Sequence, residues 1–269
     1  MSSGKNVNYW FAVSVSVLFG IFSLAYLSLE YGSPAFNATV FFGNVILPAM
    51  VAALGFLTLR WVRPSTSAGK SVLFLSLGML FWGLGDVAWS AYKYTLISLA
   101  DILYLLGYLM IFIALVIGIR MSSPDVFHDR KKSSLLIGGL LVICLAYFYF
   151  YPLSWDPGVS FIENLVTAGY VIADLMIIVP AAFLCYSLFS GELSGPWILI
   201  LVALVIGVAG DMWYISNYEL YEQGGKFLAD LGWYAMYFLF AYSFLLFRKT
   251  QESAESFAAM KFSGPGKRR

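Results

Sequence analysis

Histidine and cysteine are almost absent from this chain, which has one histidine and two cysteines among 269 residues. His128 stands alone between apolar runs, and neither Cys144 nor Cys185 has a second His or Cys at metal-ligand spacing. No lysine lies in the middle of an apolar run. These absences exclude a histidine-ligated zinc centre, a Ser-His nucleophile and a retinal Schiff base. We therefore expect no metal and no cofactor.

Charge is also scarce, because only 12% of the residues are charged and 61% are hydrophobic. The apolar residues form blocks of about twenty, the length of a helix that crosses a bilayer. Runs of this length without period-2 alternation indicate helices and exclude a β-barrel. We predict an all-α, multi-pass membrane protein with eight spans: Tyr9–Leu29, Phe41–Val62, Ser71–Tyr92, Ile97–Arg120, Ser133–Tyr151, Phe161–Phe189, Pro196–Tyr218 and Lys226–Phe247.

Basic residues are distributed unevenly between the two sides of these spans. Of the 16 Lys and Arg residues, all but Lys93 and Lys226 fall on one side. Basic residues accumulate on the cytoplasmic side, so both termini are expected to be cytoplasmic and the location to be the cell membrane. The net charge of +1 gives no reason to expect nucleic-acid binding, and membrane lipids are the expected partners.

Several short segments occur twice along the chain. The offset between the copies stays between 120 and 129 residues, which indicates an ordered duplication. The matching segments are Leu24–Tyr26 with Leu145–Tyr147, Phe41–Asn44 with Phe161–Asn164, Gly85–Asp86 with Gly210–Asp211, and Leu99–Asp101 with Leu228–Asp230. We predict two tandem four-helix repeats, 1–125 and 126–250, and a mobile cytoplasmic tail, 251–269. Because each repeat has an even number of spans, the axis relating them should run along the membrane normal.

Four aspartates lie at corresponding depths in the two repeats. Asp86 and Asp211 lie about 10 Å inside the outer ends of their spans, and Asp101 and Asp230 begin the spans that follow. A carboxyl at membrane depth costs several kcal/mol unless it is paired, protonated or wetted. One interpretation is an outward-facing cavity, with the four carboxyls in two facing pairs, Asp86 with Asp101 and Asp211 with Asp230, or in one central cluster. The other is that each Asp accepts hydrogen bonds from Tyr, Trp or Asn and fixes helix packing.

Aromatic residues accompany these aspartates at helical spacing. Asp101, Tyr104 and Tyr108 share one helix face, and the repeat has an equivalent face. The second face consists of Asp230, Trp233 and Tyr237. A carboxylate beside a row of rings suits a ligand with a polar head and an apolar body, although aromatic belts at membrane interfaces have the same composition.

Three further polar residues extend the candidate ligand site. Asn44 and Asn164, near the outer ends of the second and sixth spans, would add amide contacts. Asp174 lies near the middle of the sixth span and has no duplicate. It either bonds to Tyr170 or a facing helix as a neutral acid, or marks a path for a proton or ligand.

Two segments carry a resemblance to a known family: Phe81–Trp89 and Ser98–Tyr108, which read FWGLGDVAW and SLADILYLLGY. They resemble the eight-helix membrane domains fused to bacterial and archaeal diguanylate cyclases and sensor histidine kinases. This resemblance implies a sensory role. In this chain it would require a separate signalling partner at the cytoplasmic face.

The chain is less closely similar to the lysoplasmalogenase family. Its members are also eight-helix proteins with a Gly-Asp on an internal helix and a second acid later in the chain. This similarity implies that Asp86 and Asp211 form an acid/base pair that cleaves a lipid vinyl ether.

Three functions are therefore compatible with the sequence, and whether the protein is an enzyme is left open. The first is ligand binding or sensing, with a small amphipathic or lipid-like ligand in the outward-facing cavity. The second is a lipid hydrolase that uses Asp86 and Asp211. The third is a small-solute transporter, which would need a path to the cytoplasmic side past Asp174.

Cysteine labelling tests the predicted orientation. In single-cysteine variants Ser33→Cys and Ser65→Cys, a membrane-impermeant maleimide should label the first only from outside and the second only from inside. Labelling of both from the same side would contradict the predicted topology.

Overall fold

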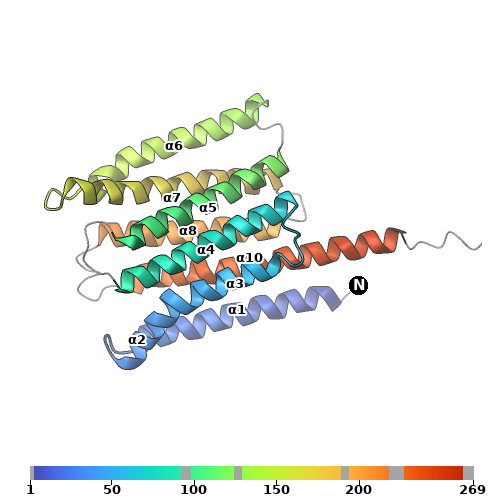
Figure 1. The fold of residues 1–269 in the computed structure, drawn as a ribbon, viewed down its shortest axis with the longest axis horizontal. Helices are drawn as coiled ribbons and strands as arrows, with labels where there is room; N and C mark the ends of the chain where they lie inside the picture. The colour runs from blue at the N-terminus through green and yellow to red at the C-terminus, as the bar shows by residue number, and fades with distance from the viewer. Residues whose placement is uncertain (1–2, 92–97, 124–128, 189–193, 218–226, 263–269) are drawn as a thin grey trace, which may run out of the picture.

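The computed structural model describes residues 3–91, 98–123, 129–188, 194–217 and 227–262, and every regular element in these ranges is a helix (Figure 1). The elements are α1 Ser3–Ser28, α2 Pro34–Phe41, η1 Phe42–Ile46, α3 Leu47–Thr58, α4 Ser67–Ala91, α5 Leu99–Ser122, α6 Arg130–Ser154, α7 Phe161–Leu188, α8 Ser194–Ser216 and α10 Phe227–Phe262. The predicted all-α class is confirmed for this part of the chain.

Six helical stretches in the described residues are long and apolar enough to cross a membrane. They are Pro34–Thr58, Ser67–Ser90, Leu99–Ser122, Phe161–Leu188, Ser194–Ser216 and Ala229–Glu252. The predicted first and fifth spans correspond to α1 and α6, which do not belong to this set. The side chains of α1 are described only from Val13 onward, and from there to Ser28 the helix is apolar. These six helices are the membrane-crossing elements that the structure supports.

Two predicted boundaries differ from the helices observed. The second span was predicted to begin at Phe41, but its helix begins at Pro34, where Ser33 caps the first turn by accepting from the Phe36 N–H. The eighth span was predicted to end at Phe247, whereas α10 continues to Phe262. The first part of the predicted tail therefore continues a transmembrane helix.

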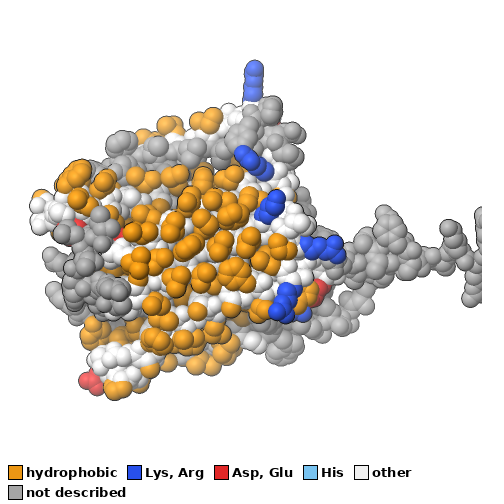
Figure 2. Space-filling view, in the orientation of Figure 1, with side chains coloured by type: hydrophobic (Ala, Val, Ile, Leu, Met, Phe, Trp, Pro, Cys, Tyr) orange, Lys and Arg blue, Asp and Glu red, His pale blue; other side chains and the backbone are white. Residues whose placement is uncertain are grey.

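The long axes of the helices are roughly aligned, and α1 lies at one edge of the bundle and α6 at the other (Figure 1). The chain begins α1 and ends α10 at the same end of the bundle. Lys and Arg side chains line that end, beside a broad apolar band (Figure 2). We call it the basic end; the Lys and Arg residues that the helix bounds place there include Arg60, Arg63, Lys70, Arg120, Arg130, Lys131 and Arg248.

The inner helices pack in two corresponding sets. Helix α4 packs along α5, and α8 packs along α10. Helix α3 contacts α4 and α10, while α7 contacts α8 and α5. The outer helices differ, because α1 packs on α10 and α2, and α6 packs on α7 and α8. The fully buried core between the sets includes Leu75, Ile111, Leu115, Trp197, Tyr234 and Phe240.

Glycines allow the two central helix pairs to approach closely. A Cβ added at Gly107 of α5 would lie 2.3 Å from Cδ1 of Trp82 on α4. A Cβ at Gly207 of α8 would lie 2.5 Å from Sδ of Met236 on α10. The large residue is thus on the first helix of one pair and on the second helix of the other. In each pair, a large side chain on one helix packs against a glycine on the other.

A π-helical turn, η1, separates α2 from α3 at the level where Tyr234 of α10 packs. A Cβ added at Gly43 would lie 2.3 Å from Cε1 of Tyr234, so only glycine leaves room for that ring. The Tyr234 hydroxyl then donates to Oδ1 of Asn44 at 2.9 Å. Turns of this type widen a helix locally and often lie at functional sites.

We predict that Gly107→Ala destabilises the protein by about 1–3 kcal/mol, because the added methyl overlaps Trp82 in a packed interface. The control is Gly20→Ala in α1, where nothing lies within 4 Å of the added Cβ. Thermal unfolding of both purified variants should show a lower midpoint for Gly107→Ala only. Equal midpoints would contradict the close α4–α5 contact.

Candidate functional site

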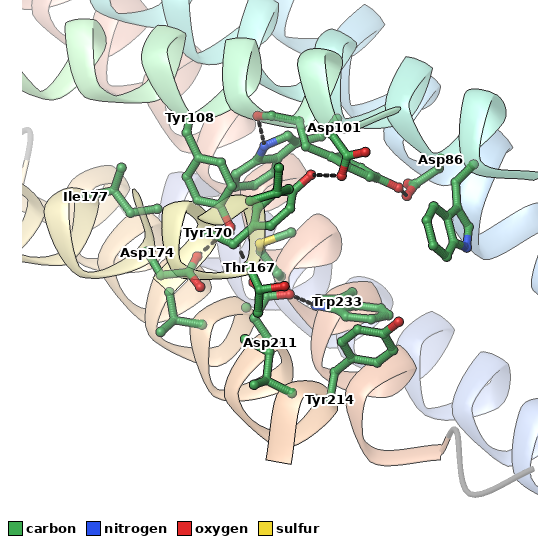
Figure 3. A pocket seen from close by; sticks show the side chains of 18 of the residues that line it. Asp86, Asp101, Tyr108, Thr167, Tyr170, Asp174, Ile177, Asp211, Tyr214 and Trp233 are labelled. Atoms are coloured by element: carbon green, nitrogen blue, oxygen red, sulfur yellow. Dashed lines mark hydrogen bonds between the residues drawn. The ribbon is translucent and has the colours of Figure 1, made fainter. Parts of the chain in front are cut away.

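A cavity of about 610 Å³ lies between α4, α5, α7, α8 and α10, in the half of the bundle opposite the basic end (Figure 3). Its walls come from the later turns of α4, the second half of α8, the first turns of α5 and α10, the first turns to the middle of α7, η1 and the connection before α7. Ten of the eleven residues that the sequence predicts for the ligand site line it: Asn44, Asp86, Asp101, Tyr104, Tyr108, Asn164, Asp174, Asp211, Trp233 and Tyr237. The structure therefore brings residues from both halves of the chain to one cavity.

Asp86 accepts hydrogen bonds from two tyrosines on different helices. Tyr104 of α5 donates to Oδ1 at 2.7 Å, and Tyr237 of α10 donates to Oδ2 at 3.1 Å. Gly85 permits the first contact, since a Cβ there would lie 2.6 Å from Cε1 of Tyr104. Both carboxylate oxygens are thus engaged by aromatic hydroxyls.

Asp211 is held in the corresponding way on α8. The Trp233 indole of α10 donates to Oδ1 at 2.9 Å, and the Tyr108 hydroxyl of α5 lies 3.4 Å from Oδ2. Each of the two aspartates therefore has one aromatic donor from its own half of the chain and one tyrosine from the other half. The Tyr108 bond to Asp211 thus connects α5 to α8, and the Tyr237 bond to Asp86 connects α10 to α4.

Asp174 is completely buried and lies beside Asp211 (Figure 3). Oδ1 of Asp174 accepts from the Tyr108 hydroxyl, the same group that approaches Asp211. Oδ2 of Asp174 receives no hydrogen bond from the described residues. The sequence predicts that Asp174 bonds either to Tyr170 or to a facing helix, and the observed donor is Tyr108 of the facing helix α5. Two carboxyls thus share one hydroxyl, which has a single proton to donate.

Asp101 combines a structural role with a place in the cavity. Its Oδ2 accepts from the backbone N–H of Ser98 at 2.8 Å and from the Ser98 hydroxyl at 2.9 Å, which caps α5. Its Oδ1 accepts from Tyr170 of α7 at 2.8 Å (Figure 3). Asp101 is therefore bonded to α7, and the predicted pairing of Asp101 with Asp86 is replaced by tyrosine contacts to each carboxyl.

Asp230 is the predicted site residue that does not line the cavity. It is 3% exposed and accepts a hydrogen bond from Tyr26 of α1. Helix α1 packs on α10 and brings Tyr26 to this carboxyl. The predicted pairing of Asp211 with Asp230 is corrected accordingly, since the carboxyl beside Asp211 is that of Asp174.

The two asparagines line the cavity, and each is already hydrogen-bonded to a neighbouring residue. Asn44 accepts from Tyr234, as described above. Asn164 accepts from the Asp156 N–H at 2.8 Å and donates to the Asp156 carbonyl at 2.7 Å. Asn164 therefore fixes the connection that precedes α7, at the rim of the cavity.

Sequence reasoning missed most of the contribution of α7. Glu163, Thr167 and Tyr170 line the cavity together with Asp174. Their spacing of four, three and four residues places them on one helix face, which is a signal that could have identified them. The other lining residues that were missed include Trp82, Trp89, Asp156 and Tyr214.

The cavity lining is acidic and aromatic. Six carboxyl residues line it, and none of the described lining residues is Lys, Arg or His. The acids are Asp86, Asp101, Asp156, Glu163, Asp174 and Asp211. Lys93 and Lys226, predicted on this side, lie outside the described residues. Among the described residues, no group of three or more His, Cys, Asp or Glu side chains is arranged to hold a metal ion.

Comparison with known proteins finds no match to any family model, curated protein or solved structure. The assignment of a function consequently depends on the cavity and its residues.

We predict that Tyr108→Phe lowers the free energy of unfolding by about 1–3 kcal/mol, because two buried carboxyls lose the hydroxyl that they share. Tyr186→Phe is the control, because Tyr186 is 67% exposed. Thermal unfolding in the same detergent should separate the two variants. An unchanged midpoint for Tyr108→Phe would mean that this hydroxyl does not hold α5 to α7 and α8.

Proposed function

We propose that this chain is a membrane-embedded ligand-binding protein with a sensory role, whose cavity receives a small amphipathic or lipid-like ligand from the outer side. The observation that carries the proposal is the fully buried carboxyl of Asp174, whose Oδ2 receives no hydrogen bond from the described residues, in a cavity lined by aromatic rings. A buried polar atom without a partner is costly, so a ligand donor there would stabilise the complex. A cavity of about 610 Å³ has the size of typical small-molecule sites.

The proposal includes eight transmembrane helices in two repeats related by an axis along the membrane normal. Supporting it, the contacts of α3 with α4 and α10 correspond to those of α7 with α8 and α5. The exchanged bonds of Tyr108 and Tyr237 correspond in the same way. Helices α1 and α6 would add one span to each repeat, although their packing differs.

The orientation follows from the basic end. Lys and Arg residues favour the cytoplasmic side, so the basic end and both termini would be cytoplasmic in the cell membrane. The cavity, in the opposite half, would then lie toward the outside. A signalling partner would dock at the basic end.

Helix α10 offers a physical connection between the cavity and that end. Trp233 and Tyr237 line the cavity, and the same helix continues without interruption to Phe262 over 36 residues. A ligand that displaced the Tyr237 hydroxyl from Asp86 would break the hydrogen bond that links α10 to α4. A shift of a rigid helix is an established way to transmit binding across a protein.

A lipid hydrolase remains the second candidate, because Asp86 and Asp211 line the same cavity. Each already accepts bonds from Tyr or Trp, which supports a packing or binding role more than an acid/base role. The transporter proposal is weaker, because the lining beside Asp174 includes the apolar side chains of Ile177 and Leu204.

Native mass spectrometry tests the proposed function. The purified full chain, incubated with extracted lipids, should retain an unaltered lipophilic ligand that Asp86→Asn and Asp211→Asn bind at least about tenfold more weakly. Glu30→Gln, an exposed acid outside the cavity lining, should retain it fully.

The same samples distinguish the hydrolase. Incubation with vinyl-ether and ether lysolipids should give no product with the wild-type chain. Turnover of the vinyl ether that disappears in Asp86→Asn and Asp211→Asn would replace the sensory proposal with the hydrolase.

A further inference from the structure

We infer that the ligand's polar head is an organic cation, an amine or quaternary ammonium group seated at Asp174 and Asp211. This inference depends on the proposed ligand-binding function and specifies the chemical class of the ligand. Its starting point is the composition of the described lining, which has acids and aromatic rings but no basic side chain.

The carboxyls of Asp174 and Asp211, which both line the cavity, favour a positive charge between them. Asp174 is fully buried, and its Oδ2 receives no hydrogen bond from the described residues. Asp211 interacts electrostatically with Asp174, and both approach the one hydroxyl of Tyr108. Two negative charges in a medium of low dielectric repel each other, and a cation placed between them would attract both. The N–H of a protonated amine would also supply the donor that Oδ2 lacks, whereas a quaternary ammonium group would bind through its charge and the aromatic rings alone.

Aromatic rings surround the same space. Tyr170 packs against Tyr104 and Tyr108 with ring centroids 6.3 Å apart in each pair. On the opposite wall, the rings of Tyr214 and Trp233 lie 5.9 Å apart (Figure 3). Ammonium groups bind to the faces of Trp and Tyr, and rings on several sides form the cages that recognise quaternary ammonium ions.

The remaining lining argues against other ligand classes. An anionic head would meet six carboxyl residues and no described base. A neutral head would leave the charge interaction between Asp174 and Asp211 unchanged. A metal ion would gain nothing from the apolar lining, which includes Val159, Val166, Ile177, Leu204 and Ile215. An organic cation uses the carboxyls, the rings and the apolar surface together.

Calorimetric titration of the full chain in a non-ionic detergent tests the inference with two probes of equal chain length. Octyltrimethylammonium should bind at least about tenfold more tightly than octanoate, after subtraction of heats from empty micelles. Asp174→Asn and Asp211→Asn should each weaken binding of the ammonium probe about tenfold or more. Glu30→Gln removes a negative charge elsewhere in the same half of the bundle and should leave binding unchanged.

Octan-1-ol serves as the neutral probe and as a check that the variants fold. Asp174→Asn should bind the alcohol as the wild-type chain does and elute at the same volume in size-exclusion chromatography. If Asp174→Asn aggregates, Asp211→Asn provides the same comparison. Equal affinities for the ammonium, the alcohol and octanoate would overturn the cation assignment while leaving a ligand-binding cavity. Absence of binding by every probe would overturn both proposals.

Tetramethylammonium distinguishes two sources of such a head group. If it binds as tightly as octyltrimethylammonium, the ligand is a water-soluble cation. If the octyl chain improves affinity at least about tenfold, the ligand is an amphipathic amine, as in a lipid head group. Both outcomes support the cation assignment.

Discussion

The fold depends on the need of buried carboxyl groups for hydrogen-bond donors in an apolar helix bundle. Asp86, Asp174 and Asp211 lie within helices that are long and apolar enough to cross a membrane, where an unbonded charge is costly. Tyr and Trp side chains from neighbouring helices supply the donors. Because each donor comes from a different helix than its acceptor, every such bond also sets the position of two helices.

Glycines make these bonds geometrically possible. Gly85 leaves space for the Tyr104 ring beside Asp86, and Gly43 leaves space for Tyr234 beside Asn44. A larger residue at either position would push the aromatic ring away from its acceptor. The close approach of the helices and their hydrogen bonds therefore depend on the same aromatic residues. Their rings pack against the glycines, and their hydroxyl groups donate the hydrogen bonds.

One carboxyl oxygen departs from this pattern of satisfied groups, and it marks the site. Oδ2 of Asp174 receives no hydrogen bond from the described residues, whereas Asp86, Asp101 and Asp211 each have a donor on both carboxyl oxygens. Proteins pair most buried polar atoms, and the exceptions concentrate where a ligand or reaction supplies the partner. The proposed ligand occupies this position, and α10 connects its surroundings to the basic end.

The sequence by itself determined the helical class, the apolar spans and the concentration of basic residues at one end, because length, periodicity and charge are local properties. It also predicted ten residues that line the cavity. Only the tertiary structure decided the partners: Tyr108 reaches Asp174 and Asp211, while Tyr26 removes Asp230 from the cavity. Helical spacing specifies the direction of a side chain around its own axis. Which neighbouring helix it meets depends on how the helices pack.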